Sequence, residues 1–381
     1  MDYKGNTMCA LNDVMAILRS ALFEEPCHSN TKNIEEILSE LEKQTALPLV
    51  FPILPQLGLT PDRYEYWENQ IYSYIVTNQT VMDTEKETVG LLHENHIPCV
   101  ILKGSSYAQY YPHPELRVRG DIDILVNESD FETAADLLIK DGFISNTTPQ
   151  KSPGARHIEY FKDGIEIELH RYFSDADKTS EYLTVSKAQA SETGIPFFPP
   201  AENGISMLLH FRFHLGRSGL RHYMDWIMYV SRVCDDAFWN NELKEKAEAF
   251  GVADLAKTLI KAGKKYFPLS HITWCDDADD AESAALLNGF FEAENFNANL
   301  SKKKAITIAS SGKSPLYWVK FITDRGIKNW KPAQKSKLLV PAAFIRQVYK
   351  YAKWYVKENG LSIKALKSDA RKVESMRERF K

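Results

Sequence analysis

Two aspartates separated by one residue are the first feature of this sequence that could do chemistry. Asp121 and Asp123 flank Ile122 in the segment DIDILV, in which charged and aliphatic residues alternate. This alternation is typical of a β-strand, so both carboxylates should project from one face and the isoleucines from the other. Two like charges this close repel unless a cation lies between them, and Mg²⁺ prefers such oxygen ligands. The pair therefore predicts a magnesium site, although a sheet with one solvated face would show the same alternation.

A second strand offers further candidate ligands. The segment HIEYFKDGIEIELH carries Asp163 and Gly164 between two alternating runs, the pattern of a tight hairpin. On its second strand, Glu166, Glu168 and His170 share one face by the same parity. If this strand lies beside the aspartate strand, a third carboxylate joins the first two, and spacing alone does not choose between the two glutamates.

Candidate anion-binding residues precede the acidic pair. The apolar run PCVIL leads into Lys103, Gly104 and Ser105, which predicts a buried strand followed by a tight turn. A glycine in such a turn lets backbone N–H groups approach an anion closely. Arg117 and Arg119 stand just before the aspartates, where guanidinium groups can clamp a triphosphate. Anion-binding residues beside metal-binding carboxylates indicate phosphoryl transfer.

The elements that must position these residues change in character along the chain. Residues 1–95 show apolar residues at helical spacing, 96–200 hold the strands and a short amphipathic helix, and 201–300 return to helical periodicity. Residues 301–381 are expected to form a basic, aromatic-rich helical tail. The sequence thus predicts an α+β protein, in which a small mixed β-sheet domain is flanked by N-terminal helices and a C-terminal helical domain.

These motifs resemble the DNA polymerase β-type nucleotidyltransferase superfamily. The shared features are the Gly-Ser turn of LKGSS, the Asp-x-Asp of RGDIDILV and the later strand IEIELH with a third acid. Within it, residues 100–172 resemble a bacterial family of uncharacterised nucleotidyltransferase-like proteins that is often associated with surface-glycan gene sets. The likeness extends more loosely over LLHFRFHLGRSGLRHYMDW. The sequence departs from the superfamily in the longer gap between Ser105 and Asp121.

The resemblance implies Mg²⁺-dependent transfer of a nucleoside monophosphate from an NTP to a hydroxyl of a small-molecule or glycan-related acceptor. Asp121 and Asp123 would hold two metal ions when nucleotide is bound. The Glu-Leu-His of the family favours Glu168 over Glu166 as the third carboxylate, which would complete one metal site and accept the proton of the acceptor hydroxyl. The rival interpretation is a catalytically inactive or antitoxin-like binding protein that keeps this fold.

The resemblance also implies a nucleotide-binding turn. Lys103, Gly104 and Ser105 would hold the phosphates of a nucleotide such as ATP, and Arg117 would neutralise charge as pyrophosphate leaves. Four further residues are candidates for the same cleft: Arg119, His170, His210 and Asp225.

Two of these cleft candidates have simpler alternatives. His210 and His214 lie four residues apart on an expected helix, but HFRFH lacks the glutamate of a zinc protease motif, and packing is the alternative role. Asp225 follows Arg221 by one helical turn, so an intrahelical ion pair is the alternative to a role in the cleft.

Charge is distributed unevenly along the chain. The formal net charge is -4, yet residues 301–381 carry 21 Lys and Arg against 5 Asp and Glu, and the remainder carries 26 against 46. A basic segment rich in aromatic residues fits contact with an anionic membrane surface or with nucleic acid, and packing against the acidic body is the simpler interpretation. The acidic first 300 residues argue against a broad nucleic-acid surface, which only the tail could supply. The expected partners are therefore an NTP and an unidentified acceptor.

The composition indicates a cytoplasmic protein. The five cysteines lie far apart without a C-x-x-C pair, which argues against a disulfide framework or a zinc ribbon and favours a reducing compartment. The sequence shows no signal peptide and no apolar run of the ~20 residues that a membrane-spanning helix needs. If the basic tail binds lipid, the protein would lie at the inner face of the membrane.

Overall fold

A computed structural model describes most of the chain. The described residues are 3–26, 33–152, 154–174, 178–215, 219–293 and parts of 319–359. They fall into two compact units, the first of which holds the described residues up to His214 and from Gly219 to Ala293. The first three predicted segments therefore share one unit, and the proposed division of the chain at residues 95, 200 and 300 stays a prediction.

The N-terminal part is helical, as predicted. Helices α1 (Tyr3–Phe23), α2 (Ile34–Lys43) and α3 (Pro61–Glu94) form there. Between α2 and α3, Leu47–Gln56 winds as a 3₁₀ segment, because its internal prolines cannot donate the hydrogen bonds of a regular α-helix. The apolar positions that predicted α1 are all buried: Leu11, Met15, Leu18 and Leu22.

Four strands form the sheet that carries the candidate site. They are β1 (Cys99–Ile101), β2 (Ile122–Val126), β3 (His157–Lys162) and β4 (Ile165–His170), in the order β1-β2-β4-β3. β2 and β4 are parallel neighbours, whereas β1 pairs with β2 and β3 pairs with β4 in antiparallel register. The mixed sheet expected from the sequence is therefore confirmed.

The hairpin between β3 and β4 closes through the predicted turn. Asp163 and Gly164 have φ angles of 50° and 83°. Two successive residues with positive φ are characteristic of the type I′ turn, whose twist matches that of the two strands it joins. The turn fixes the register of β3 on β4, in which His157 lies opposite His170 and Glu159 lies opposite Glu168.

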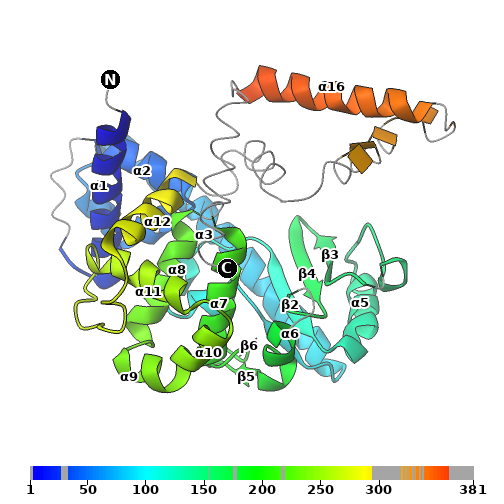
Figure 1. The fold of residues 1–381 in the computed structure, drawn as a ribbon, viewed down its shortest axis with the longest axis horizontal. Coiled ribbons are helices and arrows are strands. Elements are labelled where there is room, and N and C mark those ends of the chain that lie inside the picture. The colour runs from blue at the N-terminus through cyan, green and yellow to red at the C-terminus, as the bar shows by residue number, and fades with distance from the viewer. Residues whose placement is uncertain are drawn as a thin grey trace. The chain divides into compact units, whose positions relative to one another are not determined.

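The two faces of the sheet differ in chemistry. The apolar face packs against α3 and against α5 (Phe131–Lys140), which lies beside the sheet in Figure 1. Alternation within β2 and β4 leaves the acidic residues on the opposite face. Core residues on the apolar face include Ile101, Ile122, Ile124, Tyr160, Ile167 and Leu169.

The rest of the first unit is helical, apart from one short strand pair. Its elements are α4 (Ser105–Ala108), α6 (Lys178–Tyr182), β5 (Gln189–Ala190), β6 (Pro196–Phe197), α7 (Pro200–His214), α8 (Leu220–Arg232), α9 (Asp236–Phe238), α10 (Lys244–Ala249), α11 (Ala253–Lys264) and α12 (Asp280–Ala293). Helix α8 is buried over most of its length, so its polar residues Asp225 and His222 lie inside the protein.

The second unit contains α16 (Val340–Asn359). The expected helical character of the basic tail is confirmed for this segment, whereas residues 301–318 and 360–381 lie outside the described part of the chain. Among the helices that the structure describes, none combines the length and hydropathy needed to cross a bilayer. Membrane-surface contact by the tail and a cytoplasmic location both stay predictions.

Candidate active site

The structure brings three of the predicted carboxylates together. Asp121 directly precedes β2, Asp123 lies within it, and Glu168 is the register partner of Asp123 on the parallel strand β4. One carboxylate oxygen from each residue lies within 4.8 Å of the other two. Glu166 instead groups with Glu159 and Glu168, on the β3 side of the face. Of the two glutamates that the sequence left open, Glu168 is therefore the one beside both aspartates.

A lysine and a histidine contact the same oxygen of Asp123. Lys103 Nζ donates to Asp123 Oδ1 at 2.6 Å, and His170 Nε2 lies 3.0 Å from that oxygen and 3.1 Å from Glu168 Oε2. Lys103, expected at the nucleotide phosphates, is thus held by a carboxylate. The other oxygen, Asp123 Oδ2, is buried and has no hydrogen-bond partner among the described residues. Because buried polar atoms are seldom left unpaired, this oxygen is suited to receive a cation.

The charges of the site shift one another's pKa values. The charge of Asp123 raises the pKa of Asp121. Burial would raise the pKa of Glu168, but the hydrogen bond from His170 and the charge of Lys103 lower it to about 2. Burial would likewise lower the pKa of His170, but its contacts with Asp123 and Glu168 raise it. Contacts with Lys103 and His170 therefore partly balance the negative charge of Asp123 and Glu168. Asp121 is still repelled by Asp123.

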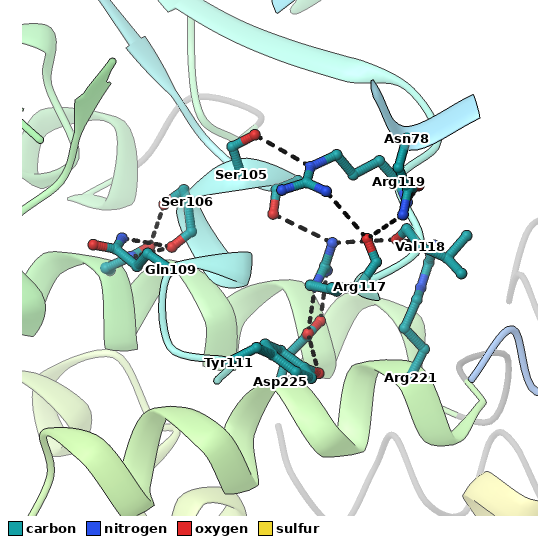
Figure 2. Close-up of polar contacts among 12 residues, drawn as sticks. Asn78, Ser105, Ser106, Gln109, Tyr111, Arg117, Val118, Arg119, Arg221 and Asp225 are labelled. Atoms are coloured by element: carbon teal, nitrogen blue, oxygen red, sulfur yellow. Dashed lines mark hydrogen bonds and ion pairs between the residues drawn. The ribbon is translucent and has the colours of Figure 1, made fainter. Parts of the chain in front are cut away.

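The predicted turn follows β1 directly. Gly104 has φ 50°, a conformation that side-chain-bearing residues rarely adopt, and it precedes the short helix α4. Arg119 Nε donates to Ser105 Oγ at 3.3 Å, as Figure 2 shows. Glu85, from α3, also hydrogen-bonds with Ser105. Hydrogen bonds with one basic and one acidic side chain, Arg119 and Glu85, thus hold the turn in place.

The guanidinium group of Arg117 forms an ion pair with a carboxylate of the helical region. Its Nε and Nη2 atoms donate to the two carboxylate oxygens of Asp225 at 2.6 and 2.7 Å, and Tyr111 donates to the same carboxylate at 2.8 Å (Figure 2). Its Nη1 donates to the carbonyl oxygen of Gly104 at 3.3 Å. The intrahelical pairing of Asp225 with Arg221, the alternative to a role in the cleft, is not found among the described residues, where Arg117 engages Asp225 and Arg221 Nη1 donates to the carbonyl of Val118. Arg117 connects helix α8 to the turn.

Helix α3 contributes two residues that sequence reasoning missed. Asn78 accepts a hydrogen bond from the backbone N–H of Arg119 and donates to the carbonyl of Arg117, at 2.9 and 3.1 Å. Asn78 and Glu85 are buried and lie seven residues apart, so they share one face of the helix. A signal was available in the sequence, since polar residues at core positions of an amphipathic helix require partners inside the protein.

Glu85 gives the fold a testable pH dependence. Burial raises its pKa from 4.5 to about 7, against the opposing effects of Ser105 and Arg119. The folded state then binds this proton more tightly than the unfolded state, so the free energy of unfolding should fall as the pH rises from about 4.5 to about 7. Glu85→Gln cannot ionise and should be the more stable protein at pH 8, by up to about 3 kcal/mol.

Urea unfolding at pH 5 and pH 8 measures this effect. The matched control is Glu87→Gln, an exposed glutamate of the same helix, which should leave the pH dependence unchanged. If Glu85→Gln changes stability equally at both pH values, the raised pKa of Glu85 is contradicted.

The histidines of the helical region form a separate group. The ring centroid of His210 lies 4.5 Å from that of His214 and 5.3 Å from that of His222. Burial lowers the pKa values of His210 and His222 well below the usual range, and the charge of Lys103 adds to the effect on both. His210 is therefore a neutral imidazole packed against other rings, and a role in the cleft stays a prediction.

The mixed sheet, with carboxylates gathered on one face beside a Gly-Ser turn, is the arrangement that the resemblance to nucleotidyltransferases predicted. The chain belongs to a family described as uncharacterised nucleotidyltransferase, whose model matches residues 30–268. That range includes all the candidate residues from Lys103 to Asp225, and the resemblance seen in the sequence is confirmed. Searches of curated proteins and of solved structures gave no match.

Proposed function

We propose that this protein is an active, Mg²⁺-dependent nucleotidyltransferase that moves a nucleoside monophosphate from an NTP to a hydroxyl group. The observation that carries the proposal is the convergence of Asp121, Asp123 and Glu168, with one buried oxygen of Asp123 left unpaired. Asp121 and Asp123 would bind Mg²⁺ together with Glu168. When bound, such ions stabilise charge on the attacking and leaving oxygens.

The environment of Glu168 favours a ligand role over a proton-accepting one. A carboxylate with a pKa of about 2 stays ionised at any physiological pH, as a metal ligand must. The same low pKa makes it a weak base, since an efficient general base has a pKa near the working pH. We therefore assign Glu168 to metal binding, in place of the proton transfer that the resemblance implied.

Arg119 is better placed than Arg117 to meet the phosphates. The charge of Arg117 is matched by Asp225, whereas Arg119 forms no ion pair among the described residues. Burial and the neighbouring Arg117 lower the pKa of Arg119 to about 10, the sign of a cation with too little compensation. A triphosphate bound at the Gly104–Ser105 turn would supply the missing negative charge.

The acceptor is proposed on the family resemblance. A hydroxyl of a small molecule or of a glycan-related compound fits the association of similar proteins with surface-glycan gene sets. The carboxylates and the Gly104–Ser105 turn would contact the metal and the nucleotide, so their geometry does not distinguish one hydroxyl acceptor from another.

Pyrophosphate release tests the proposal. The full chain is incubated with Mg²⁺ and each labelled NTP in turn, with a filtered metabolite extract as the source of acceptors. We expect release with at least one NTP, its loss in EDTA, and label in a product. Arg119→Met should weaken NTP binding about tenfold or more, since hydrogen bonds to charged groups contribute ~1.5–3 kcal/mol, whereas the exposed Arg232→Met should not.

The outcomes separate the two interpretations of the family. NTP binding without pyrophosphate release under any of these conditions would favour the catalytically inactive binding protein. The absence of both binding and release would contradict the proposed function.

A further inference from the structure

Glu168 belongs to a second group of potential metal ligands, on the same face of the sheet as Asp123 and on its β3 side. His157, Glu168 and His170 each offer one ligand atom, and these atoms lie within 4.8 Å of one another. The sheet register produces this group, because His157 and His170 are direct partners across the β3–β4 ladder. Glu168 precedes His170 by two residues and therefore projects from the same face.

The two oxygens of Glu168 face two different imidazoles. Oε2 lies 3.1 Å from His170 Nε2, and Oε1 lies 3.7 Å from His157 Nε2. The ring centroids of the two histidines are 4.9 Å apart. Two imidazole nitrogens and a carboxylate thus lie close enough together to share one metal ion.

His170 shows that this arrangement is not an ordinary packed pair. It is 2% exposed, and its Nδ1 atom is buried without a hydrogen-bond partner in the described part of the chain. A structural histidine at such depth normally satisfies both of its ring nitrogens. Nδ1 is therefore open to carry the ring proton in a tautomer that leaves the Nε2 lone pair, which faces Glu168, for a metal ion.

We infer that His157, Glu168 and His170 form a second divalent-cation site, which selects a transition-metal ion of the Zn²⁺ class over Mg²⁺. Imidazole nitrogens favour zinc and its neighbours, whereas the aspartate group offers the oxygens that Mg²⁺ prefers. The inference rests on the proposed function in that the two sites share Glu168 and that His170 also contacts Asp123. Binding places a nitrogen lone pair of each ring on the metal, and any ring protons that are displaced go to solvent.

Three adjustments accompany binding at this site, the first of which is that His170 Nε2 gives up its contact with Asp123 Oδ1. Zn²⁺ holds its ligand atoms about 2.0–2.2 Å away, so the three side chains must draw slightly closer together. Arg156 approaches His157 Nδ1 at 3.3 and 3.4 Å, and this contact must open so that Nδ1 can carry the ring proton. Both contacts are long, and His157 Nε2 already faces Glu168.

X-ray absorption at the zinc edge of the full chain tests the site. One equivalent of Zn²⁺ is added in a large excess of Mg²⁺, which occupies the oxygen-only site. We expect scattering from two imidazole rings. His157→Gln should remove one ring and weaken Zn²⁺ binding at least tenfold, whereas the exposed His113→Gln should change neither. Asp121→Asn belongs to the other group and should keep both imidazoles.

The outcomes also separate this inference from the proposed function. Zinc bound without imidazole scattering in the unaltered protein, or scattering that His157→Gln leaves intact, would overturn the second site. Two-imidazole scattering in a protein that releases no pyrophosphate would support the site and contradict only the nucleotidyltransferase activity. Circular dichroism of each variant identifies any loss that comes from unfolding.

Discussion

Replacing Asp121 and Asp123 together by asparagine is expected to abolish Mg²⁺-dependent nucleotide binding while the circular dichroism spectrum is kept. The two substitutions leave Glu168 as the only charged ligand of the group. A neutral amide is a much weaker ligand for a hard cation than a carboxylate is. The affinity for Mg²⁺-nucleotide should therefore fall by more than about 100-fold, which exceeds the loss expected when a residue that only supports a ligand is replaced. Isothermal titration calorimetry with NTP, in Mg²⁺ and in EDTA, gives the measurement.

The single variants separate metal binding from folding. Asp121 is exposed and is repelled by Asp123, so Asp121→Asn should weaken Mg²⁺ binding and yet raise the free energy of unfolding slightly, by about 0.2–1 kcal/mol. Asp123→Asn should lower stability instead, because it removes the carboxylate that pairs with Lys103 and His170. Opposite effects on stability with the same effect on binding would identify the aspartates as ligands.

The matched control for the double variant uses two exposed aspartates on the helices beside the sheet. Asp83→Asn with Asp136→Asn removes the same charge without touching the carboxylate group. Nucleotide binding should be unchanged in this control. Binding that is equally unchanged in the Asp121 and Asp123 variant would rule out the metal assignment.

Local sequence patterns were sufficient to predict which residues share the acidic face. Period-two alternation placed Asp121 and Asp123 together, and the Asp163-Gly164 turn placed β3 against β4. Both features depend on residues close together in the chain. The choice of Glu168 over Glu166 required more, because it depends on the parallel pairing of β2 with β4, which involves strands more than 40 residues apart. The sequence suggested this choice only through the family resemblance.

The partners of the charged side chains could not be predicted in the same way. Residue type and position suited Arg117 to a phosphate, but a buried aspartate 108 residues later engages its guanidinium group. Lys103 was likewise expected at a phosphate, but the fold pairs it with Asp123. Neither pairing leaves a local pattern, since a buried charge takes whichever opposite charge the tertiary structure brings near. Asn78 and Glu85 differ, because polar residues at core positions of α3 are visible in the sequence as groups that need partners inside the protein.

The ion pair between Arg117 and Asp225 is expected to be the most sensitive electrostatic contact in the described structure. Its two side chains are 5% and 1% exposed, and two short hydrogen bonds join them. Asp225→Asn keeps the volume but leaves the buried guanidinium unpaired, which should cost about 3–5 kcal/mol of unfolding free energy. Arg117→Met should cost a similar amount. Urea unfolding followed by tryptophan fluorescence measures both.

The double variant Arg117→Met with Asp225→Leu tests the cause of this loss. Replacing both charges by apolar groups removes the unpaired ion, so the double variant should be more stable than either single variant. Arg19 and Glu25 provide the matched surface pair, with two hydrogen bonds of 2.6 and 2.9 Å and side chains 41% and 35% exposed. Arg19→Met should cost less than about 1 kcal/mol. Equal losses at the two pairs, or additive losses in the double variant, would show that burial does not set the strength of the Arg117 contact.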